Sequence, residues 1–412
     1  MNVILFEDDR ATALYPVTVG RAAFHISCGS YRLIDLVGQL GQLVACLVRP
    51  HLRGVQQADY PHLSSAHLDR RAPVLLVNAA LVPSVESLAR LKTTLDARQT
   101  VAIRTKGRLA AALLPAGSPI PPDDLGGKSL DDWLRPYQPS AAEIELPLFE
   151  YPHEILLYHL ETLKANLAHR LSCGTYEEIA ASVFAARGAQ LGAHVVTDTQ
   201  AGPIVLEENA RIGPYCYLSG PAHVGRAARV IEHAAIKDGV ALGHTTKIGG
   251  EVEASVIEPY TNKQHHGFLG HSYLGSWINL GAGTCNSDLK NTYGLVNMEY
   301  GGRKVSTGMQ FIGCIIGDYA KTAINTGIFT GKTIGVCSMV YGFVTTNVPS
   351  FVNYARSFGQ VTETPADVMI ATQARMFARR DVPQRPCDMQ LLIDMFELTR
   401  SERQLAGEPL SL

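Results

Sequence analysis

Aliphatic residues recur every six positions through the middle of the chain. The first run keeps one frame over eight consecutive positions, namely Leu206, Ile212, Leu218, Val224, Val230, Ile236, Leu242 and Ile248. A second run has the same spacing at Ile316, Thr322, Ile328, Ile334 and Val340. A period of six fits neither an amphipathic helix nor an alternating strand. It predicts a solenoid of very short strands, in which neighbouring coils bury one another.

Glycine often follows the aliphatic residue of a hexad, as at Gly213, Gly225, Gly243 and Gly249. Glycine is the residue that tight turns and close backbone approaches require. We therefore expect a corner of the coil after each short strand.

The first 150 residues have a different pattern, in which apolar runs alternate with helical spacing. We expect strands at Asn2–Phe6, Pro73–Asn78 and Thr100–Thr105, and helices at Tyr31–Leu47 and Ser84–Thr94, with Ser84 as a possible N-cap. Buried strands alternating with helices favour a parallel sheet. Residues 1–150 are thus predicted to form an α/β domain.

The other segments are predicted to be mainly helical. Apolar residues at helical spacing over 151–170 indicate a connecting helical segment, which we extend to 187. The solenoid then covers 188–350. A helical tail covers 351–412, with helices around Ala366–Ala378 and Met389–Glu402.

Composition and charge limit the classes of partner. The net charge of −2 excludes a strongly basic nucleic-acid surface, although patches for small anions remain possible. None of the eight cysteines forms a C-x-x-C pair, so we expect reduced thiols in a reducing compartment. The N-terminus reads as a strand, and no apolar stretch is long enough to span a bilayer. We therefore expect a cytoplasmic protein without a membrane partner.

Residues 264–284, QHHGFLGHSYLGSWINLGAGT, carry a narrower motif. They align without a gap to the pattern G-H-L-T-Y-L-G-x-x-x-I-G-x-x-V-N-I-G-A-G-T. This segment, with the hexads, resembles the left-handed β-helix acetyltransferase domain of the bifunctional enzymes that make UDP-N-acetylglucosamine. The order of motifs resembles a diverged branch of that family, described as sugar nucleotidyltransferases. The resemblance implies a left-handed parallel β-helix, acetyl-coenzyme A as co-substrate, an amino-sugar phosphate as acceptor and a homotrimer.

The same alignment implies individual site residues. His265 takes the place of the family's general base, and histidine suits that role because its pKa lies near neutral. Phe268 stands where the family has a tyrosine. The implied substrate-binding positions are Lys237, Lys263, Phe268, Asn279, Asn286 and Lys290, with Arg303 as a further available cation. The implied coenzyme A positions are Ala282, Gly283, Lys321 and Lys332.

Two alternatives remain open within this segment. His271 is a rival base, because His271-Ser272-Tyr273-Leu274-Gly275 is itself similar to H-x-Y-L-G. Trp277 is either a ligand cover or an aromatic cap on a coil corner. A metal site is not expected, because no acid or cysteine completes a ligand set with the histidines.

The N-terminal domain departs from the family at both of its signatures. Intact nucleotidyltransferases open with a glycine-rich loop that cradles phosphates, whereas this chain reads Phe6-Glu7-Asp8-Asp9-Arg10. The family's metal-binding aspartate is replaced by Asn78. Asp8, Asp9 and Arg21 are the candidate replacements for nucleotide binding. Mg²⁺ is expected only if this domain is active, and loss of its catalysis is the alternative.

Three functions compete. The first is an acetyl-coenzyme A-dependent N-acetyltransferase acting on an amino-sugar 1-phosphate such as glucosamine 1-phosphate. The second is a sugar-1-phosphate nucleotidyltransferase in which the β-helix serves assembly. The third is a non-catalytic scaffold that binds sugar nucleotides.

Overall fold

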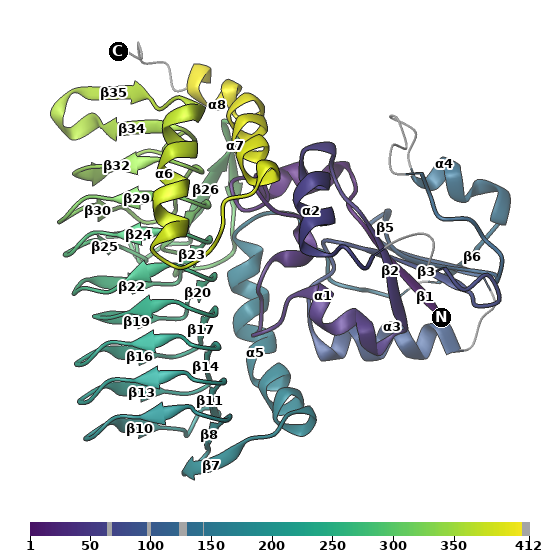
Figure 1. Ribbon diagram of the computed structural model, residues 1–412, viewed down its shortest axis with the longest axis horizontal. Helices are drawn as coiled ribbons and strands as arrows, with labels where there is room; N and C mark the ends of the chain where they lie inside the picture. The colour runs from purple at the N-terminus through teal and green to yellow at the C-terminus, as the bar shows by residue number, and fades with distance from the viewer. Residues whose placement is uncertain (64–67, 97–99, 123–129, 143, 406–412) are drawn as a thin grey trace. The chain divides into compact units, whose positions relative to one another are not determined.

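The computed structural model describes residues 1–63, 68–96, 100–122, 130–142 and 144–405, and the chain forms two compact units (Figure 1). The first unit consists of Met1–Leu14, Arg21–Ile26 and Tyr31–Glu150. The second consists of Tyr15–Gly20, Ser27–Ser30 and Tyr151–Leu412. Two short pieces of the N-terminal sequence therefore belong to the second unit.

A 6-stranded sheet forms the first unit, in the order β2-β1-β3-β5-β4-β6. Its strands are β1 (Asn2–Phe6), β2 (Gln42–Leu47), β3 (Val74–Asn78), β4 (Val101–Thr105), β5 (Arg108–Leu114) and β6 (Ser140–Ala142). Strand β1 is parallel to β2 and β3, but β5 is antiparallel to β3 and β4. The sheet is therefore mixed and not wholly parallel. Lys106 and Gly107, with φ of 50° and 80°, form the two-residue turn that returns the chain from β4 directly into β5.

The predicted helix over Tyr31–Leu47 is wrong. The chain makes one helical turn in α1 (Leu33–Leu36) and then runs as strand β2. Gly41 allows this path, because a Cβ there would lie 2.3 Å from the Met1 carbonyl oxygen. The helix predicted at Ser84 is confirmed as α3 (Val85–Asp96), where the Ser84 hydroxyl accepts a hydrogen bond from the Ser87 N–H at 3.0 Å. The other α-helices described in this unit are α2 (Arg53–Asp59) and α4 (Leu130–Leu134).

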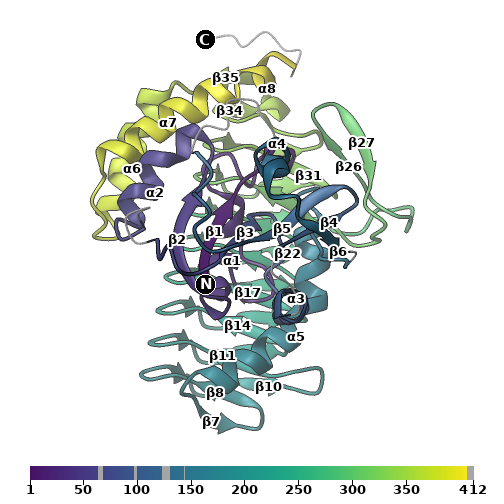
Figure 2. The same cartoon turned by 90° about the vertical axis from the view of Figure 1, so that its right-hand side faces the viewer.

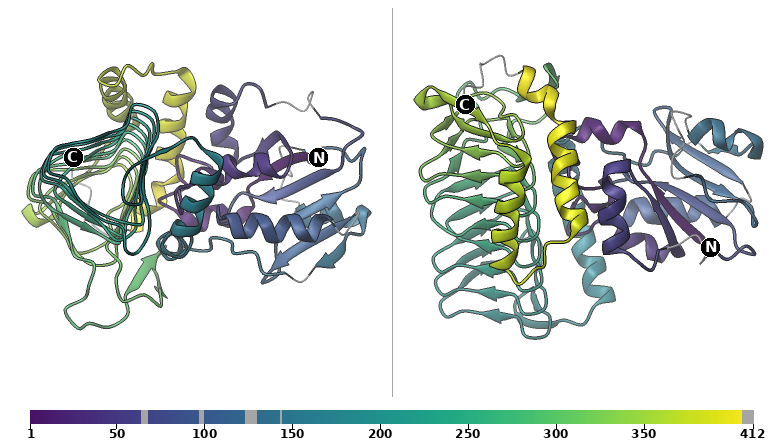
Figure 3. Two further views of the ribbon diagram at one scale, coloured as in Figure 1. Left: turned by 90° about the horizontal axis from the view of Figure 1, so that it is seen from below. Right: turned by 45° about the horizontal axis from the view of Figure 1, so that its top comes forward.

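Short parallel strands stack as a left-handed β-helix in the second unit, and Figure 3 shows the coil end-on as a triangle. Ile212 pairs with Val230, and Val230 pairs with Ile248. Each step from 212 to 230 to 248 is 18 residues, or three hexads per coil. The coil therefore has three faces, each made of one strand per turn.

The first face contains β7 (Glu177–Ala180), β8 (Val183–Ala185), β11 (Ile204–Leu206), β14 (Ala222–Val224), β17 (Val240–Leu242), β20 (Val256–Ile257), β23 (Tyr273–Leu274), β28 (Cys314–Ile316) and β31 (Lys332–Ile334). The second face contains β9 (Gln190–Leu191), β12 (Arg211–Ile212), β15 (Arg229–Val230), β18 (Lys247–Ile248), β21 (Asn262–Lys263), β24 (Asn279–Leu280), β29 (Lys321–Thr322), β32 (Met339–Val340), β34 (Val352–Ala355) and β35 (Gln360–Glu363). The strands of the coil begin before residue 188, with β7 on the first face. They continue past residue 350, with β34 and β35 on the second face.

The third face contains β10 (Val196–Asp198), β13 (Tyr217–Ser219), β16 (Ala235–Lys237), β19 (Glu251–Glu253) and β22 (Phe268–Gly270), followed by β25 (Cys285–Asn286), β30 (Gly327–Ile328) and β33 (Phe343–Val344). The antiparallel hairpin β26 (Asn297–Tyr300) and β27 (Arg303–Ser306) leaves the coil between β25 and β28, and Figure 2 shows it at the edge of the coil.

The hexad residues form the core of the coil, as predicted. All eight of the first run are at most 3% exposed and belong to one hydrophobic cluster. The glycines after them are needed because successive coils approach closely. A Cβ on Gly225, for example, would lie 2.5 Å from the Leu242 carbonyl oxygen.

Helix α5 (Glu154–Cys173) agrees with the helix expected over 151–170 and packs on the coil, whereas the extension of the helical segment to 187 is wrong, because β7 and β8 occupy it. Leu163 and Leu167 bury against Val205 of the first face. Arg170 forms an ion pair with Glu207 at 3.0 Å, and the His223 Nε2 atom lies 3.1 Å from the same carboxylate. Burial alone would raise the pKa of Glu207, but His223, Arg170 and Tyr176 lower it to about 2. A charged network thus fixes the helix to the coil.

The tail forms α6 (Ala366–Ala378), α7 (Pro386–Leu398) and α8 (Arg400–Leu405). The first tail helix has the predicted bounds, whereas the second predicted helix is divided into α7 and α8. No helix in the described part of the chain combines the length and apolarity that a membrane crossing requires.

Candidate functional site

A row of polar side chains occupies successive coils of the second face. Arg229 pairs with Lys247, Lys247 with Asn262, Asn262 with Asn279, and Asn279 with Lys321. Each is the first residue of its strand, ahead of a buried core position. Adjacent strands lie about 4.8 Å apart, so the row from Lys247 to Lys321 is about 14 Å long. The row therefore presents cations at both ends and amides between them.

A groove of about 600 Å³ runs over this row. Its lining consists of Lys247, Tyr260, Asn262, Gln264, His265, Trp277, Ile278, Asn279, Leu280, Gly281, Ala282, Lys321, Ile324, Met376, Arg379 and Arg380. It thus brings together four predicted site residues, namely His265, Asn279, Ala282 and Lys321. Among the described residues, no carboxylate lines it.

The end of α6 forms one side of the groove, and Figures 1 and 3 show this helix alongside the coil. Trp277 lies between Tyr260 and Phe377, with ring centroids 4.2 Å and 4.5 Å away. Both ring contacts of Trp277 are thus with protein groups, which makes it an aromatic cap that docks the helix. Arg380 donates a hydrogen bond to the Asn262 side-chain oxygen at 2.6 Å.

His265 lies in the turn after β21 and is exposed along the groove. The side chain of Lys263 fixes the backbone of this turn. Its ammonium donates hydrogen bonds to the carbonyl oxygens of Gly249 at 2.7 Å and His265 at 3.2 Å. Lys263 is only 2% exposed, and burial lowers its pKa to about 8. The turn that carries His265 is therefore supported by a buried cation.

Among the described residues, no carboxylate forms an ion pair with the lysines and arginines that line the groove. Burial, followed by the charges of Arg380, Arg229 and Arg379, lowers the pKa of Lys247. At the other end, burial lowers the pKa of Lys321 to about 8, and its ammonium donates to the Tyr319 carbonyl oxygen at 3.0 Å. The groove can therefore accept a long ligand that carries negative charge.

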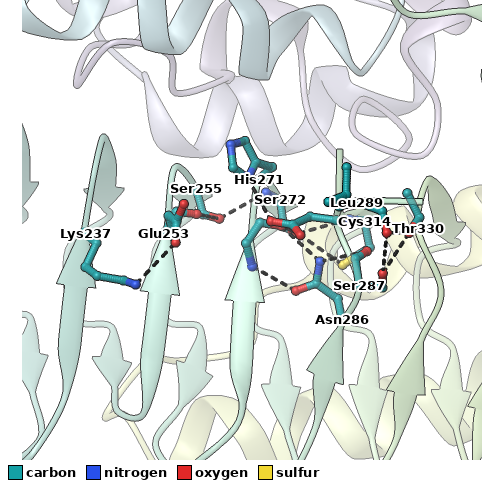
Figure 4. Close-up of polar contacts among 12 residues, drawn as sticks. Lys237, Glu253, Ser255, His271, Ser272, Asn286, Ser287, Leu289, Cys314 and Thr330 are labelled. Atoms are coloured by element: carbon teal, nitrogen blue, oxygen red, sulfur yellow. Dashed lines mark hydrogen bonds and ion pairs between the residues drawn. The ribbon is translucent and has the colours of Figure 1, made fainter. Parts of the chain in front are cut away.

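His271 lies elsewhere, at the corner after β22, in a His–Asp pair (Figure 4). Its Nδ1 atom is 2.9 Å from the Asp288 carboxylate, and the ring stacks on Phe311 at 5.2 Å. Donation of the Nδ1 proton to Asp288 would leave Nε2 as a proton acceptor. The pair has the arrangement of a general base, although it does not line the groove.

The three lysines expected to bind phosphate do not line the groove. Lys237 forms ion pairs with Glu253 at 3.4 Å (Figure 4) and with Glu251 at 2.6 Å, and the hydrogen bond to Glu251 raises its pKa. Lys263 is the buried support described above. Lys290 donates to the Leu295 carbonyl oxygen within its own loop. All three ammonium groups are held by protein atoms, and their assignment to substrate binding stays a prediction.

Other predicted binding residues also have different surroundings. Asn286 is buried and bonds across the coil, accepting from the Gly270 N–H at 2.9 Å and donating to the Gly270 carbonyl at 3.0 Å. Phe268 lies on the third face, and Lys332 on the first, where burial lowers its pKa. Gly283 forms a corner with φ of 75° next to Ala282. Of these four, none contributes a side chain to the groove. Arg303 begins hairpin strand β27, away from the groove lining.

In the first unit, Asp8 is part of a closed network at the end of β1. Its carboxylate accepts from Arg108 at 2.6 Å and 2.9 Å, and from the Asn78 amide at 2.8 Å. Asp9 begins a short 3-10 helix. The Arg21 carbonyl oxygen accepts from Arg49, which also pairs with Glu7 at 3.0 Å. Arginine side chains therefore neutralise Glu7 and Asp8.

These surroundings do not fit Mg²⁺. An Mg²⁺ site needs free carboxylate oxygens, whereas both oxygens of Asp8 accept from arginine and Asn78 is uncharged. Within the described ranges, no cluster of three His, Cys, Asp or Glu side chains is placed to hold a metal ion.

The sequence did not indicate Arg379 and Arg380, which lie more than a hundred residues after His265. The only available signal was two consecutive arginines at the end of a predicted helix. The pairing of His271 with Asp288 was not predicted either, because the two residues lie 17 positions apart.

Comparisons with known proteins find matches to parts of this chain. Residues 3–171 match the family model described as sugar nucleotidyl transferase. A bifunctional sugar-1-phosphate nucleotidylyltransferase/acetyltransferase of Sulfurisphaera tokodaii is 29% identical over 142 residues, covering 34% of this chain and 35% of that protein. The bifunctional protein GlmU of Ralstonia pickettii is 30% identical over 144 residues, covering 32% of this chain and 30% of that protein. The matches span about a third of the length of these relatives.

Among solved structures, the UDP-N-acetylglucosamine acyltransferase of Francisella novicida is 14% identical, with a TM-score of 0.34, and the match covers 53% of this chain and 88% of that one. The sequence matches combine a nucleotidyl transferase domain with the name of an acetyltransferase. Parts of the chain are therefore similar to a sugar nucleotidyl transferase domain and to the bifunctional sugar-1-phosphate nucleotidylyltransferase/acetyltransferases.

Proposed function

We propose that the groove on the second face catalyses acyl transfer from acetyl-coenzyme A to the amine of an amino-sugar phosphate such as glucosamine 1-phosphate. The observation that carries the proposal is the meeting of His265, Asn279, Ala282 and Lys321 on one groove. The names of the curated relatives support acetyl transfer and a sugar phosphate.

In this reaction, His265 acts as the general base. The acceptor nitrogen attacks the thioester carbonyl carbon, a C–N bond forms, and the C–S bond breaks to release the coenzyme A thiolate. The imidazole takes the proton from nitrogen and returns it to the thiolate sulfur. The groove suits the donor because Gly281 and Ala282 leave room along the coil and Lys321 supplies a cation for a phosphate.

The test is release of free thiol from acetyl-coenzyme A in the presence of glucosamine 1-phosphate. We expect His265→Ala to reduce kcat by about 10²-fold or more, because a positioned base contributes at least that factor. His271→Ala is the matched control and should keep most of the activity. Loss of turnover only in the His271 variant would transfer the role of base to the His271–Asp288 pair.

We also propose a homotrimer that places this groove between neighbouring chains. Ile324 lines the groove and is 69% exposed, and Phe329 and Phe343 on adjacent coils are 51% and 60% exposed. A neighbouring copy would cover these apolar side chains. Sedimentation equilibrium tests this, and a monomer at micromolar concentration would contradict it.

A second candidate, nucleotidyl transfer by the first unit, is favoured by the family match over residues 3–171. The arginine-bound Asp8 argues against it. Pyrophosphate release from UTP or dTTP with a sugar 1-phosphate and Mg²⁺ would establish this activity. Failure of both assays, with no binding of coenzyme A, would leave the non-catalytic scaffold.

We place the protein in the cytoplasm. Every cysteine of the chain lies in the described part and is unpaired in the structure, which suits a reducing compartment.

A further inference from the structure

Three cations line one end of the groove, namely Lys247 of the coil and Arg379 and Arg380 after α6, and Arg229 lies beside Lys247 on the neighbouring coil. The positions come from two distant parts of the sequence. The pairing of β15 with β18 sets Arg229 beside Lys247, and the groove lining contains Lys247, Arg379 and Arg380.

In the described part of the chain, few protein groups pair with these four positive charges. Within the described part of the chain, the ammonium of Lys247 and the guanidinium groups of Arg229 and Arg379 form no side-chain hydrogen bond or ion pair, and Arg380 bonds only to the neutral amide of Asn262. The mutual repulsion is large enough to lower the pKa of both Lys247 and Arg380, after the effect of burial. Like charges held this close destabilise the protein unless an anion binds between them.

The order of polar side chains along the groove suits a ligand with one anionic end. From Lys247 the row continues through the amides of Asn262 and Asn279, which donate and accept hydrogen bonds, to His265 and Lys321. An acceptor with hydroxyl groups and a terminal phosphate matches this order. Arginine also supplies the forked donors that bind phosphate oxygens in pairs.

We propose that Arg229, Lys247, Arg379 and Arg380 form a phosphoryl-binding subsite, in which the segment after α6 supplies half of the charge. This rests on the proposed function of the groove for the identity of the reactant, but the subsite itself is defined by the cations. The phosphoryl group belongs either to the sugar-phosphate acceptor or to coenzyme A.

The test is calorimetric titration of the full chain with inorganic pyrophosphate. Arg379→Gln is the main variant, because no hydrogen bond of its guanidinium supports the fold. Losing one charge-assisted contact should weaken pyrophosphate binding at least about tenfold. Arg375→Gln, which changes an exposed arginine of α6, is the matched control and should bind as the wild type does. Equal affinity of the Arg379 and Lys247→Gln variants with the wild type would overturn the subsite.

Two further titrations identify the reactant. A weakened affinity of Arg379→Gln for glucosamine 1-phosphate, but not for glucosamine, assigns the subsite to the acceptor. A weakened affinity for coenzyme A, but not for pantetheine, assigns it to the donor. If neither phosphate-bearing ligand is affected, the proposal is wrong.

The outcomes separate this proposal from the proposed function. Arginine-dependent pyrophosphate binding without any thiol release keeps the subsite and removes acyl transfer. Thiol release that depends on His265, with pyrophosphate binding unchanged in all the arginine and lysine variants, keeps acyl transfer and removes the subsite.

Discussion

At the scale of single residues, the surroundings of a side chain decided its role more than its place in a motif did. Lys263 lies in the matched segment, yet its ammonium supports the turn below His265 and does not line the groove. His271 pairs with Asp288, whereas His265 lies along the groove. The alignment predicted both histidines as candidates. It could not show which lysines are held by carbonyl groups, because those contacts cross from one coil to the next.

The buried Lys263 predicts a dependence of stability on pH. Its pKa is lowered from 10.5 to about 8 in the folded chain, so between these values the unfolded chain binds more protons at this residue. The unfolding free energy of the wild type, relative to Lys263→Met, should therefore rise by about 3 kcal/mol as the pH increases through this window. Urea unfolding at about pH 7.5, 9.0 and 10.5 spans this window and measures the rise.

Lys164→Met, which changes an exposed lysine of α5, is the control for general effects of high pH. A difference between the wild type and Lys263→Met that stays constant with pH would mean that Lys263 is not a buried cation.

At the scale of elements, a repeated pattern predicted more than local propensity did. The six-residue period predicted the coil and its core, because each aliphatic position must face inward on every turn. The helix predicted over Tyr31–Leu47 failed because strand β2 pairs with β1, a contact that local spacing does not contain. The contribution of α6 to the groove was also not predictable, because only the fold brings Arg379 beside Lys247.

Close stacking of the coils predicts a large effect of Gly225→Ala. The added Cβ would lie 2.5 Å from the Leu242 carbonyl oxygen, so the coil must shift to accommodate it. We expect a loss of about 2 kcal/mol in unfolding free energy, the usual cost of overpacking. Gly38→Ala is the control, since its Cβ would meet no atom within 4 Å. Equal stability of the two variants in urea unfolding would show that the coils are not packed this closely.

At the scale of the whole molecule, the two units differ in the chemistry that their described residues support. The first unit keeps the mixed α/β sheet, but arginine neutralises the acids where a phosphate loop would be expected. The second unit has a coil whose groove is lined by a histidine, two asparagines, and lysines and arginines that form no ion pair with an acid among the described residues. We therefore locate the chemistry of this chain in the second unit.

The most direct measurement is a crystal structure of the protein with coenzyme A. Acyl transfer in the groove predicts that the coenzyme A sulfur lies within contact distance of the His265 imidazole, with the cofactor along Ala282 and Lys321. Coenzyme A bound with its sulfur beside His271, or away from the second face altogether, would contradict the assignment of the groove as the acyl-transfer site.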